Sequence, residues 1–177
     1  FKMEIATQAA RNKNGDIRIY PVVETIQKNH ICHIVKASRN KFAGIKEEVN
    51  NIAKKILEEI EYVGVIGIEM FLTKDDRILV NELAPRVHNT GHYTIEGAFV
   101  SQFENHIRAI LDLPLGDTDM TSDSAVMINI LGEKDVPAKL VRLGALLEND
   151  KAYLQVYGKD ETKTGRKMGH ITVLDKY

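Results

Sequence analysis

The chain has 177 residues, 44% of them apolar, and its 24 basic and 25 acidic side chains give a formal net charge of −1. This is enough for one moderate domain or two small ones, and the near-zero charge provides no bulk field for a polyanion, so we expect no nucleic-acid partner. Cys32 is the only cysteine, which excludes an internal disulfide, and no apolar stretch has the length of a membrane span, so we expect a cytoplasmic protein with no membrane partner.

The first part of the sequence predicts strands followed by one helix. Residues 4–11 and 17–24 are rich in strand formers and flank the turn sequence Asn-Lys-Asn-Gly, which is typical of a hairpin. Residues 31–37 are expected to add a strand to the same sheet. In residues 45–60 the apolar positions recur every three or four residues, which predicts an amphipathic helix.

A second predicted hairpin brings two acidic residues together. Its strands are residues 63–72 and 77–83, joined by the polar sequence Thr-Lys-Asp-Asp. Alternation along the first strand places its isoleucines on the core face and Glu69 on the opposite face. If the turn falls between the two aspartates, Glu69 lies opposite Glu82.

This glutamate pair is a candidate metal site. Two carboxylates so close repel each other unless a cation lies between them, and oxygen ligands on a rigid sheet suit Mg²⁺. Magnesium in such a position usually bridges substrate phosphates, which indicates a nucleoside triphosphate enzyme. On spacing alone, exposed strand glutamates without a ligand are the more common case, so both interpretations stay open.

Beyond the second hairpin the sequence predicts a loop, a helix and a smaller unit. Residues 84–94 contain Pro, Asn and Gly without a regular period, and residues 101–113 return to helical spacing. A polar turn cluster at residues 114–119 marks a boundary, so we predict two domains, residues 1–116 and 117–177. The smaller unit has a predicted strand, a short helix and two further strands, at residues 125–131, 138–147, 152–157 and 170–174.

Three motifs carry a family resemblance. The longest is Asn-Glu-Leu-Ala-Pro-Arg-Val-His-Asn-Thr-Gly-His-Tyr-Thr at residues 81–94. The second combines Tyr-Gly-Lys at residues 157–159 with Gly-Arg-Lys-Met-Gly-His at residues 165–170, and the third begins at residues 1–4. In these motifs, and over essentially its whole length, the chain resembles the N5-carboxyaminoimidazole ribonucleotide synthetases of the ATP-grasp superfamily.

The resemblance implies an α+β fold and a ligase activity. Residues 1–116 would form the second lobe of an ATP-grasp domain, a mostly antiparallel sheet with helices, and residues 117–177 a small C-terminal α/β domain closing the ribonucleotide site. The implied reaction carboxylates 5-aminoimidazole ribonucleotide with ATP and bicarbonate, through carboxyphosphate, in purine biosynthesis. The family's N-terminal domain and first ATP-grasp lobe have no counterpart here, so we expect a fragment that is inactive alone. Full-length family members are often homodimers.

The resemblance also assigns the ATP and metal site. It makes Glu69 and Glu82 ligands of Mg²⁺, with Mn²⁺ as the alternative, and it places Glu82 and Asn81 beside the ATP phosphates. Glu4 would accept hydrogen bonds from the ATP ribose. Gln27 stands where family members often carry a histidine on the nucleotide side.

The remaining assignments concern the ribonucleotide. By resemblance, Arg86 and His88 are catalytic and lie, together with Asn89, beside the ribonucleotide and the carboxyphosphate. A guanidinium fork can hold such an anion with two hydrogen bonds. Lys159 and Arg166 would clamp the 5′-phosphate of the ribonucleotide.

Two alternatives remain. Another ATP-grasp enzyme, such as a biotin carboxylase or a formate-using transformylase, would share the glutamate pair. A protein of a different class, a non-catalytic fragment, would bind the ribonucleotide phosphate without turning over ATP.

Overall fold

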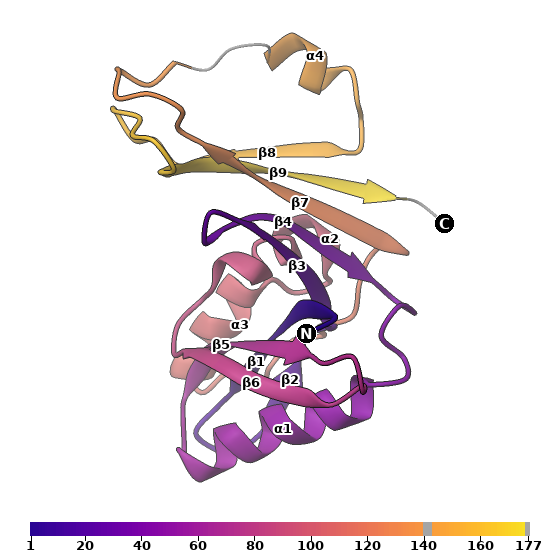
Figure 1. The fold of residues 1–177 in the computed structure, drawn as a ribbon. Coiled ribbons are helices and arrows are strands. Elements are labelled where there is room, and N and C mark those ends of the chain that lie inside the picture. The colour runs from indigo at the N-terminus through magenta and orange to yellow at the C-terminus, as the bar shows by residue number, and fades with distance from the viewer. Residues whose placement is uncertain (140–142, 176–177) are drawn as a thin grey trace.

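The computed structural model describes residues 1–139 and 143–175, and it contains one antiparallel sheet that continues from the N-terminal half into the C-terminal part (Figure 1). Its strands are β1 (Met3–Arg11), β2 (Ile17–Ile19), β3 (Val23–Lys28), β4 (Ile31–Ser38), β5 (Gly64–Leu72), β6 (Ile78–Ala84), β7 (Ser124–Leu131), β8 (Ala152–Val156) and β9 (Lys167–Asp175). In space they follow the order β6-β5-β1-β3-β4-β7-β9-β8, and β2 also pairs with β1. The helical segments are α1 (Lys46–Glu59), the 3₁₀ turn η1 (Asn89–Gly91), α2 (Thr94–Gly97), α3 (Gln102–Ile110) and α4 (Leu143–Leu147).

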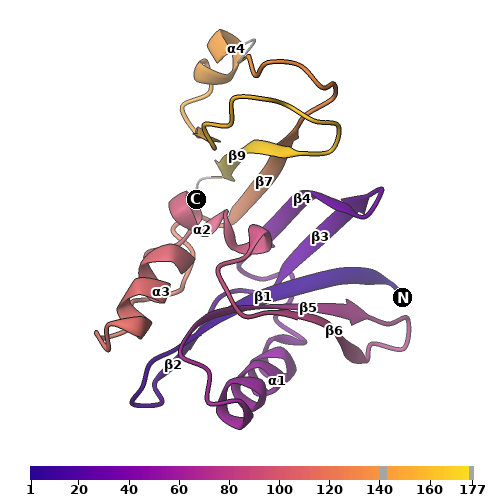
Figure 2. The ribbon, with the colours of Figure 1, turned by 90° about the vertical axis from the view of Figure 1, so that its left-hand side faces the viewer.

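Helix α1 covers one face of β1, β5 and β6 (Figure 2). Its Val49, Ala53 and Leu57 are fully buried and belong to the same apolar cluster as Ile66 and Ile68 of β5. The predicted helix over residues 45–60 is therefore confirmed, and so is the core face of the predicted strand.

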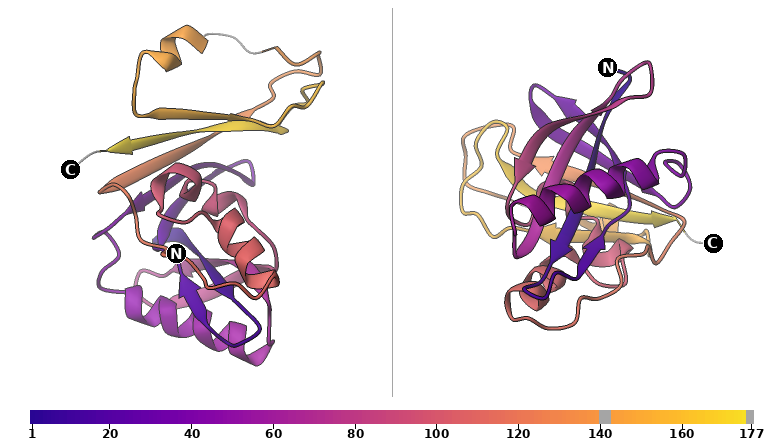
Figure 3. Two further views of the ribbon diagram at one scale, coloured as in Figure 1. Left: turned by 180° about the vertical axis from the view of Figure 1, so that it is seen from behind. Right: turned by 90° about the horizontal axis from the view of Figure 1, so that it is seen from below.

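The opposite face of the sheet carries η1, α2 and α3, and the left panel of Figure 3 shows this side of the molecule from behind. A second apolar cluster on this side includes Ala6 of β1, Val35 of β4, Tyr93 before α2 and Met127 of β7. Because β4 pairs directly with β7, hydrogen bonding of the sheet passes from the N-terminal half into the C-terminal part. The division into residues 1–116 and 117–177 remains a prediction.

The first hairpin forms as predicted, with one interruption. β1 pairs with β2 across the Asn-Lys-Asn-Gly turn, but the second arm stops after Ile19 and resumes as β3 at Val23. Pro21 lies in the gap, and a proline has no N–H to donate to a sheet ladder. The break lets one predicted strand pair with two separate parts of β1.

Helix α3 is shorter than predicted, and its apolar residues do not face the core. Ser101 caps its N-terminus by accepting a hydrogen bond from the backbone N–H of Glu104. The buried residues on α3 are Gln102, Asn105 and Ala109. The residues that carry the helical spacing are all exposed, at 37–62%, and they are Phe103, Ile107, Ile110 and Leu111.

Several details of the second half differ from the predictions. Helix α4 begins at Leu143 rather than at residue 138. Residues 138–139 are not helical, and the backbone N–H of Ala138 donates to the backbone oxygen of Asp160. Residues 140–142 of the predicted helix lie outside the described part. β9 starts at Lys167, three residues earlier than predicted, and the predicted loop 84–94 includes η1. None of the helices in the described ranges has the length and apolarity required to cross a membrane.

Candidate functional site

Glu69 and Glu82 are direct partners in the β5–β6 ladder, as predicted. Cross-strand partners point to the same face of a sheet, so both carboxylates leave the face opposite α1. The register that produces this pairing differs from the simple one. Near the turn, Met70 pairs with Val80, and a β-bulge then leaves Asn81 as the extra residue before Glu82.

A third carboxylate lies on the same face. In the β1–β5 pairing, Glu4 stands two residues before the partner of Glu69, so the two side chains share a face. The pKa of Glu69 is raised, first by burial and then by the negative charges of Glu82 and Glu4. Lys167 and Arg86 oppose this shift. The three glutamates therefore form a concentration of negative charge that a bound cation would neutralise.

The donor set fits a hard divalent cation. Two carboxylates on neighbouring strands offer oxygen ligands, which Mg²⁺ prefers, while the remaining positions are usually filled by phosphate oxygens and water. In the described residues, no group of three or more His, Cys, Asp or Glu side chains is arranged to hold a metal ion.

The loop after β6 returns His88 to this face. Its Nε2 lies 3.8 Å from Oε1 of Glu69. The close approach depends on Gly67 of β5, because a Cβ at that position would lie 2.6 Å from the Cβ of His88. Burial, followed by the positive charges of Arg86 and Lys167, lowers the pKa of His88 to about 4. The imidazole is neutral near pH 7, so its contact with Glu69 is not an ion pair.

Lys167 is the functional candidate to which the sequence analysis gave no role. It is half-buried at the start of β9, and burial lowers its pKa while the negative charge of Glu69 favours its charged form. The positive charge of Arg86, which is exposed on the loop, also lowers the pKa of Lys167. The signal was the position of Lys167 inside the Gly-Arg-Lys-Met-Gly-His motif, which becomes informative once the strand is known to begin there.

The predicted phosphate clamp is only partly assembled. Lys159 donates a 2.6 Å hydrogen bond to the backbone oxygen of Lys167, and its ammonium lies 5.6 Å from the ring centroid of Tyr157. Arg166 instead donates to the backbone oxygen of Glu161 in the preceding loop, at 2.9 Å. The structure therefore brings Lys159 to Lys167, whereas the recorded contact of Arg166 is within its own loop.

Three further predicted site residues lie on strands of the sheet or are hydrogen-bonded to one. The side-chain amides of Asn89 and Asn129 exchange hydrogen bonds of 2.9 and 2.7 Å, which tie the loop to β7. Gln27 pairs with Cys32 in the β3–β4 ladder, and Asn81 is exposed on β6. Burial raises the pKa of the Cys32 thiol to about 11, so it is uncharged and serves as a packing residue.

An aromatic cluster connects the same loop to β9. The rings of His92 and His170 are 5.2 Å apart, and the hydroxyl of Tyr157 lies 2.8 Å from Nδ1 of His170. Phe103 of α3 stacks on His92 at 5.4 Å. Burial lowers the pKa of His92 to about 3 and that of His170 to about 4, so both are neutral. Their positions between α3, the loop and β9 support structural roles.

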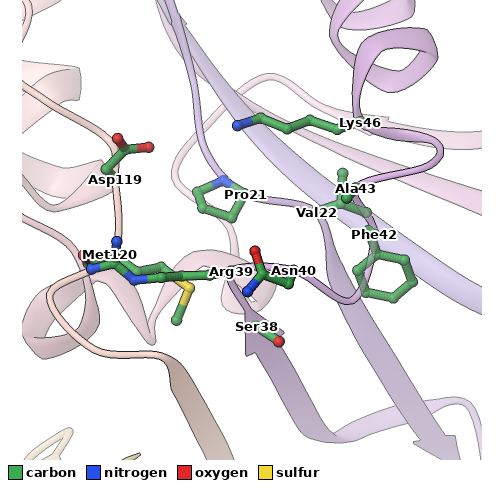
Figure 4. Close-up of a pocket in the computed structure, with 10 residues that line it drawn as sticks. All are labelled: Pro21, Val22, Ser38, Arg39, Asn40, Phe42, Ala43, Lys46, Asp119 and Met120. Carbon is green, nitrogen blue, oxygen red and sulfur yellow. Dashed lines mark hydrogen bonds between the residues drawn. The ribbon is translucent and has the colours of Figure 1, made fainter. Parts of the chain in front are cut away.

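A separate cavity of about 230 Å³ lies beside the N-terminus of α1 (Figure 4). None of the predicted site residues lines it. Arg39, one of its lining residues, donates hydrogen bonds to the backbone oxygens of Met120 and Ser122. The cavity is thus distinct from the glutamate face. Its lining residues are Pro21, Val22, Ser38, Arg39, Asn40, Phe42, Ala43, Lys46, Asp119 and Met120.

Two family descriptions match the chain. Residues 1–103 match the ATP-grasp domain, which covers β1 to the start of α3 and therefore the glutamate face. Residues 125–177 match the C-terminal domain of phosphoribosylaminoimidazole carboxylase, which contains β7, β8 and β9.

Known proteins with similar sequences and structures agree with these matches. N5-carboxyaminoimidazole ribonucleotide synthase of Bacillus subtilis is 46% identical over 177 residues, an alignment that covers 98% of this chain and 44% of the relative. The synthetase of Thermotoga maritima has a solved structure with a TM-score of 0.90 and 47% identity, covering 99% of this chain and 48% of that one. The synthase of Aspergillus clavatus, solved with ADP and 5-aminoimidazole ribonucleotide, has a TM-score of 0.91 and 40% identity, covering 100% of this chain and 48% of that one. The chain thus spans a little under half the length of these relatives.

Proposed function

The chain belongs to the ATP-grasp family, and from that premise we propose that it is part of an ATP-dependent ligase that carboxylates 5-aminoimidazole ribonucleotide in purine biosynthesis. The observation that carries the proposal is the pairing of Glu69 with Glu82 on one sheet face, with His88 above it and Lys167 nearby. The relatives that share this segment are named for that product.

The proposed first step is a phosphoryl transfer. An oxygen of bicarbonate attacks the γ-phosphorus of ATP, the bond to the β-phosphate oxygen breaks, and ADP leaves as carboxyphosphate forms. Glu69 and Glu82 would hold Mg²⁺, or Mn²⁺, against the phosphates, and the ion would neutralise charge on the transferring group. Asn81 and Glu82 lie on the strand that would border the phosphates, while Glu4 would accept hydrogen bonds from the ribose and Gln27 would contact the nucleotide side.

The second step transfers the carboxyl group. Carboxyphosphate releases phosphate, and the exocyclic amine of the ribonucleotide forms a bond to the carbon and loses a proton. Arg86 and Lys167 would stabilise the anionic intermediate, and His88 would donate a hydrogen bond to it. Asn89 would border the ribonucleotide, and Lys159 with Arg166 would hold its 5′-phosphate. To do so, the side chain of Arg166 must give up its hydrogen bond to the backbone oxygen of Glu161.

The test is phosphate release from ATP. We expect the natural protein that carries this chain to release phosphate only when bicarbonate and 5-aminoimidazole ribonucleotide are both present, and the isolated chain to release none. Release that needs biotin or formate instead of the ribonucleotide would favour another ATP-grasp activity. Ribonucleotide binding without ATP turnover by the natural protein would favour a binding role.

Two further properties belong to the same proposal. We place the reaction in the cytoplasm, where its substrates are expected, and we expect a homodimer for the natural protein. Sedimentation of the natural protein tests the dimer, and a monomeric mass at assay concentration would contradict it.

A further inference from the structure

The loop that bears His88 is fixed from two sides by buried polar side chains. Gln102, fully buried at the start of α3, donates from Nε2 to the backbone oxygen of His88 at 2.7 Å and accepts from the backbone N–H of His88 at Oε1, at 3.0 Å. These two bonds fix the backbone of the residue. Its ring is fixed separately, by Thr90 and Gln8.

The ring contact is a two-step hydrogen-bond relay. Nε2 of Gln8 donates to Oγ1 of Thr90 at 2.7 Å, and the same Oγ1 lies 2.9 Å from Nδ1 of His88. Gln8 and Thr90 are both 0% exposed, so water does not compete for these bonds. The relay therefore crosses from the central strand β1 to the loop entirely within the protein.

The donor and acceptor capacities of the three side chains determine the direction of these hydrogen bonds. The amide NH₂ of Gln8 can only donate, so Thr90 accepts from it and keeps its own hydroxyl proton for another partner. Within the described residues, Nδ1 of His88 is the recorded acceptor within reach of that hydroxyl. Nδ1 then carries a lone pair, and the ring proton of the neutral imidazole sits on Nε2.

Two observations support this direction. The reversed arrangement would need Gln8 to accept from Thr90, which would put the amide nitrogen where its oxygen now lies, buried without a partner. An orphaned buried N–H is rarer than an under-satisfied carbonyl oxygen. In addition, Nε2 faces Oε1 of Glu69 at 3.8 Å, and a lone pair directed at a carboxylate would be repelled whereas an N–H is attracted.

We propose that Gln8 and Thr90 are positioning residues that hold His88 in its Nε2–H tautomer, so that the loop offers the active site a neutral hydrogen-bond donor and not a base. The ligand of that donor would be the carboxyphosphate or bicarbonate anion of the proposed reaction, and this part of the inference rests on the proposed function. The tautomer itself does not depend on which reaction the protein catalyses.

The tautomer is measurable by nitrogen NMR on protein labelled with ¹⁵N-histidine, with the His88→Gln variant used to assign the signals. We expect Nδ1 of His88 to show the shift of an unprotonated ring nitrogen and Nε2 that of a protonated one. In Thr90→Val, which keeps the shape but removes the hydroxyl, we expect this preference to be lost, and in Thr90→Ser to be kept. An Nδ1–H tautomer in the unsubstituted protein would overturn the proposal even if the carboxylation activity is found.

Kinetics of the natural protein separate positioning from a structural role. We expect Thr90→Val to lower kcat by about 10- to 100-fold, as loss of a supporting hydrogen bond commonly does, with KM for ATP unchanged. Thr90→Ser should restore kcat. A loss of activity in Thr90→Val that Thr90→Ser does not restore, or that leaves the tautomer unchanged, would overturn the positioning role. Absence of carboxylation by the unsubstituted protein would instead refute the proposed function.

Discussion

At the residue scale, the site depends on how closely the loop after β6 approaches the sheet. The absence of a side chain at Gly67 leaves room for His88 directly above the strand that carries Glu69. The sequence predicted the chemical types at this site because Glu82, Arg86 and His88 lie in the motif at residues 81–94, and the hairpin register places Glu69 opposite Glu82. It did not predict the support of His88, since Gln8 and Gln102 are distant in sequence and ordinary in type.

Substitution of Gly67 tests this close approach. In Gly67→Ala the new methyl group would overlap His88, and we expect a loss of about 1–3 kcal/mol in the free energy of unfolding, as for other overpacked sites. Gly44→Ala is the matched control, because a Cβ there meets nothing within 4 Å, and we expect a change within about 0.5 kcal/mol. Urea denaturation of both variants measures the difference, and equal stabilities would contradict the described packing.

The proposed clamp of the 5′-phosphate by Lys159 and Arg166 gives a kinetic prediction. For the natural protein, Lys159→Ala and Arg166→Ala should each raise the KM for the ribonucleotide by about tenfold or more, since a charge-assisted hydrogen bond contributes about 1.5–3 kcal/mol. The KM for ATP should hardly change. Initial rates with one substrate varied at a time provide the measurement, and equal effects on both KM values would contradict a clamp specific to the ribonucleotide.

At the element scale, the strands and helices were mostly predictable, while two details of how they meet were not. The β5–β6 pairing was correct at the glutamates although the turn register was shifted, because the bulge at Asn81 compensates for it. Periodicity cannot reveal a bulge in advance, since one extra residue has no composition signal of its own. The apolar spacing of α3 predicted a helix but not its orientation, because its buried face carries Gln102 and Asn105, which are satisfied by hydrogen bonds.

The two helices should therefore respond differently to truncation. Leu57→Ala on α1 removes a fully buried side chain, and we expect a loss of about 2–5 kcal/mol in the free energy of unfolding. Ile107→Ala on α3 removes a side chain that is 50% exposed in this chain, and we expect a loss of less than about 1 kcal/mol. Chemical denaturation of the chain gives both values. A cost for Ile107→Ala as large as that for Leu57→Ala would show that this side of α3 is covered.

At the scale of the whole molecule, the two matched family segments are joined by β4–β7 pairing and by a cluster of neutral histidines. His92 and His170 have folded-state pKa values of about 3 and 4, below the value of about 6.5 expected in an unfolded chain. The unfolded chain therefore binds protons that the native protein does not. This stabilising contribution is complete above about pH 6.5 and is lost as the pH falls toward the folded-state values.

We accordingly expect stability to fall between pH 7.5 and 5.5. The midpoint of urea unfolding, measured at both values, should drop more for the unsubstituted chain than for a His92→Gln/His170→Gln variant. His30→Asn is a suitable control, because His30 is exposed in the β3–β4 turn at φ 60°, which asparagine tolerates. A pH response of the double variant as steep as that of the control would contradict the role of these histidines.

The proposed function depends most on Glu69 and Glu82, which would together hold a divalent cation at the phosphates of ATP. The most direct measurement is Mn²⁺ binding to the natural protein with ATP, followed by the electron paramagnetic resonance signal of free Mn²⁺, alongside ATP turnover. We predict that Glu82→Gln weakens Mn²⁺ binding by about tenfold or more and removes turnover while the fold stays intact. Loss of a residue that only supports a metal ligand commonly lowers metal affinity by about tenfold or more, and loss of a ligand itself should cost at least as much. Glu47→Gln, on α1 beneath the other face of the sheet, should leave both unchanged. Unchanged Mn²⁺ affinity in Glu82→Gln would contradict the account.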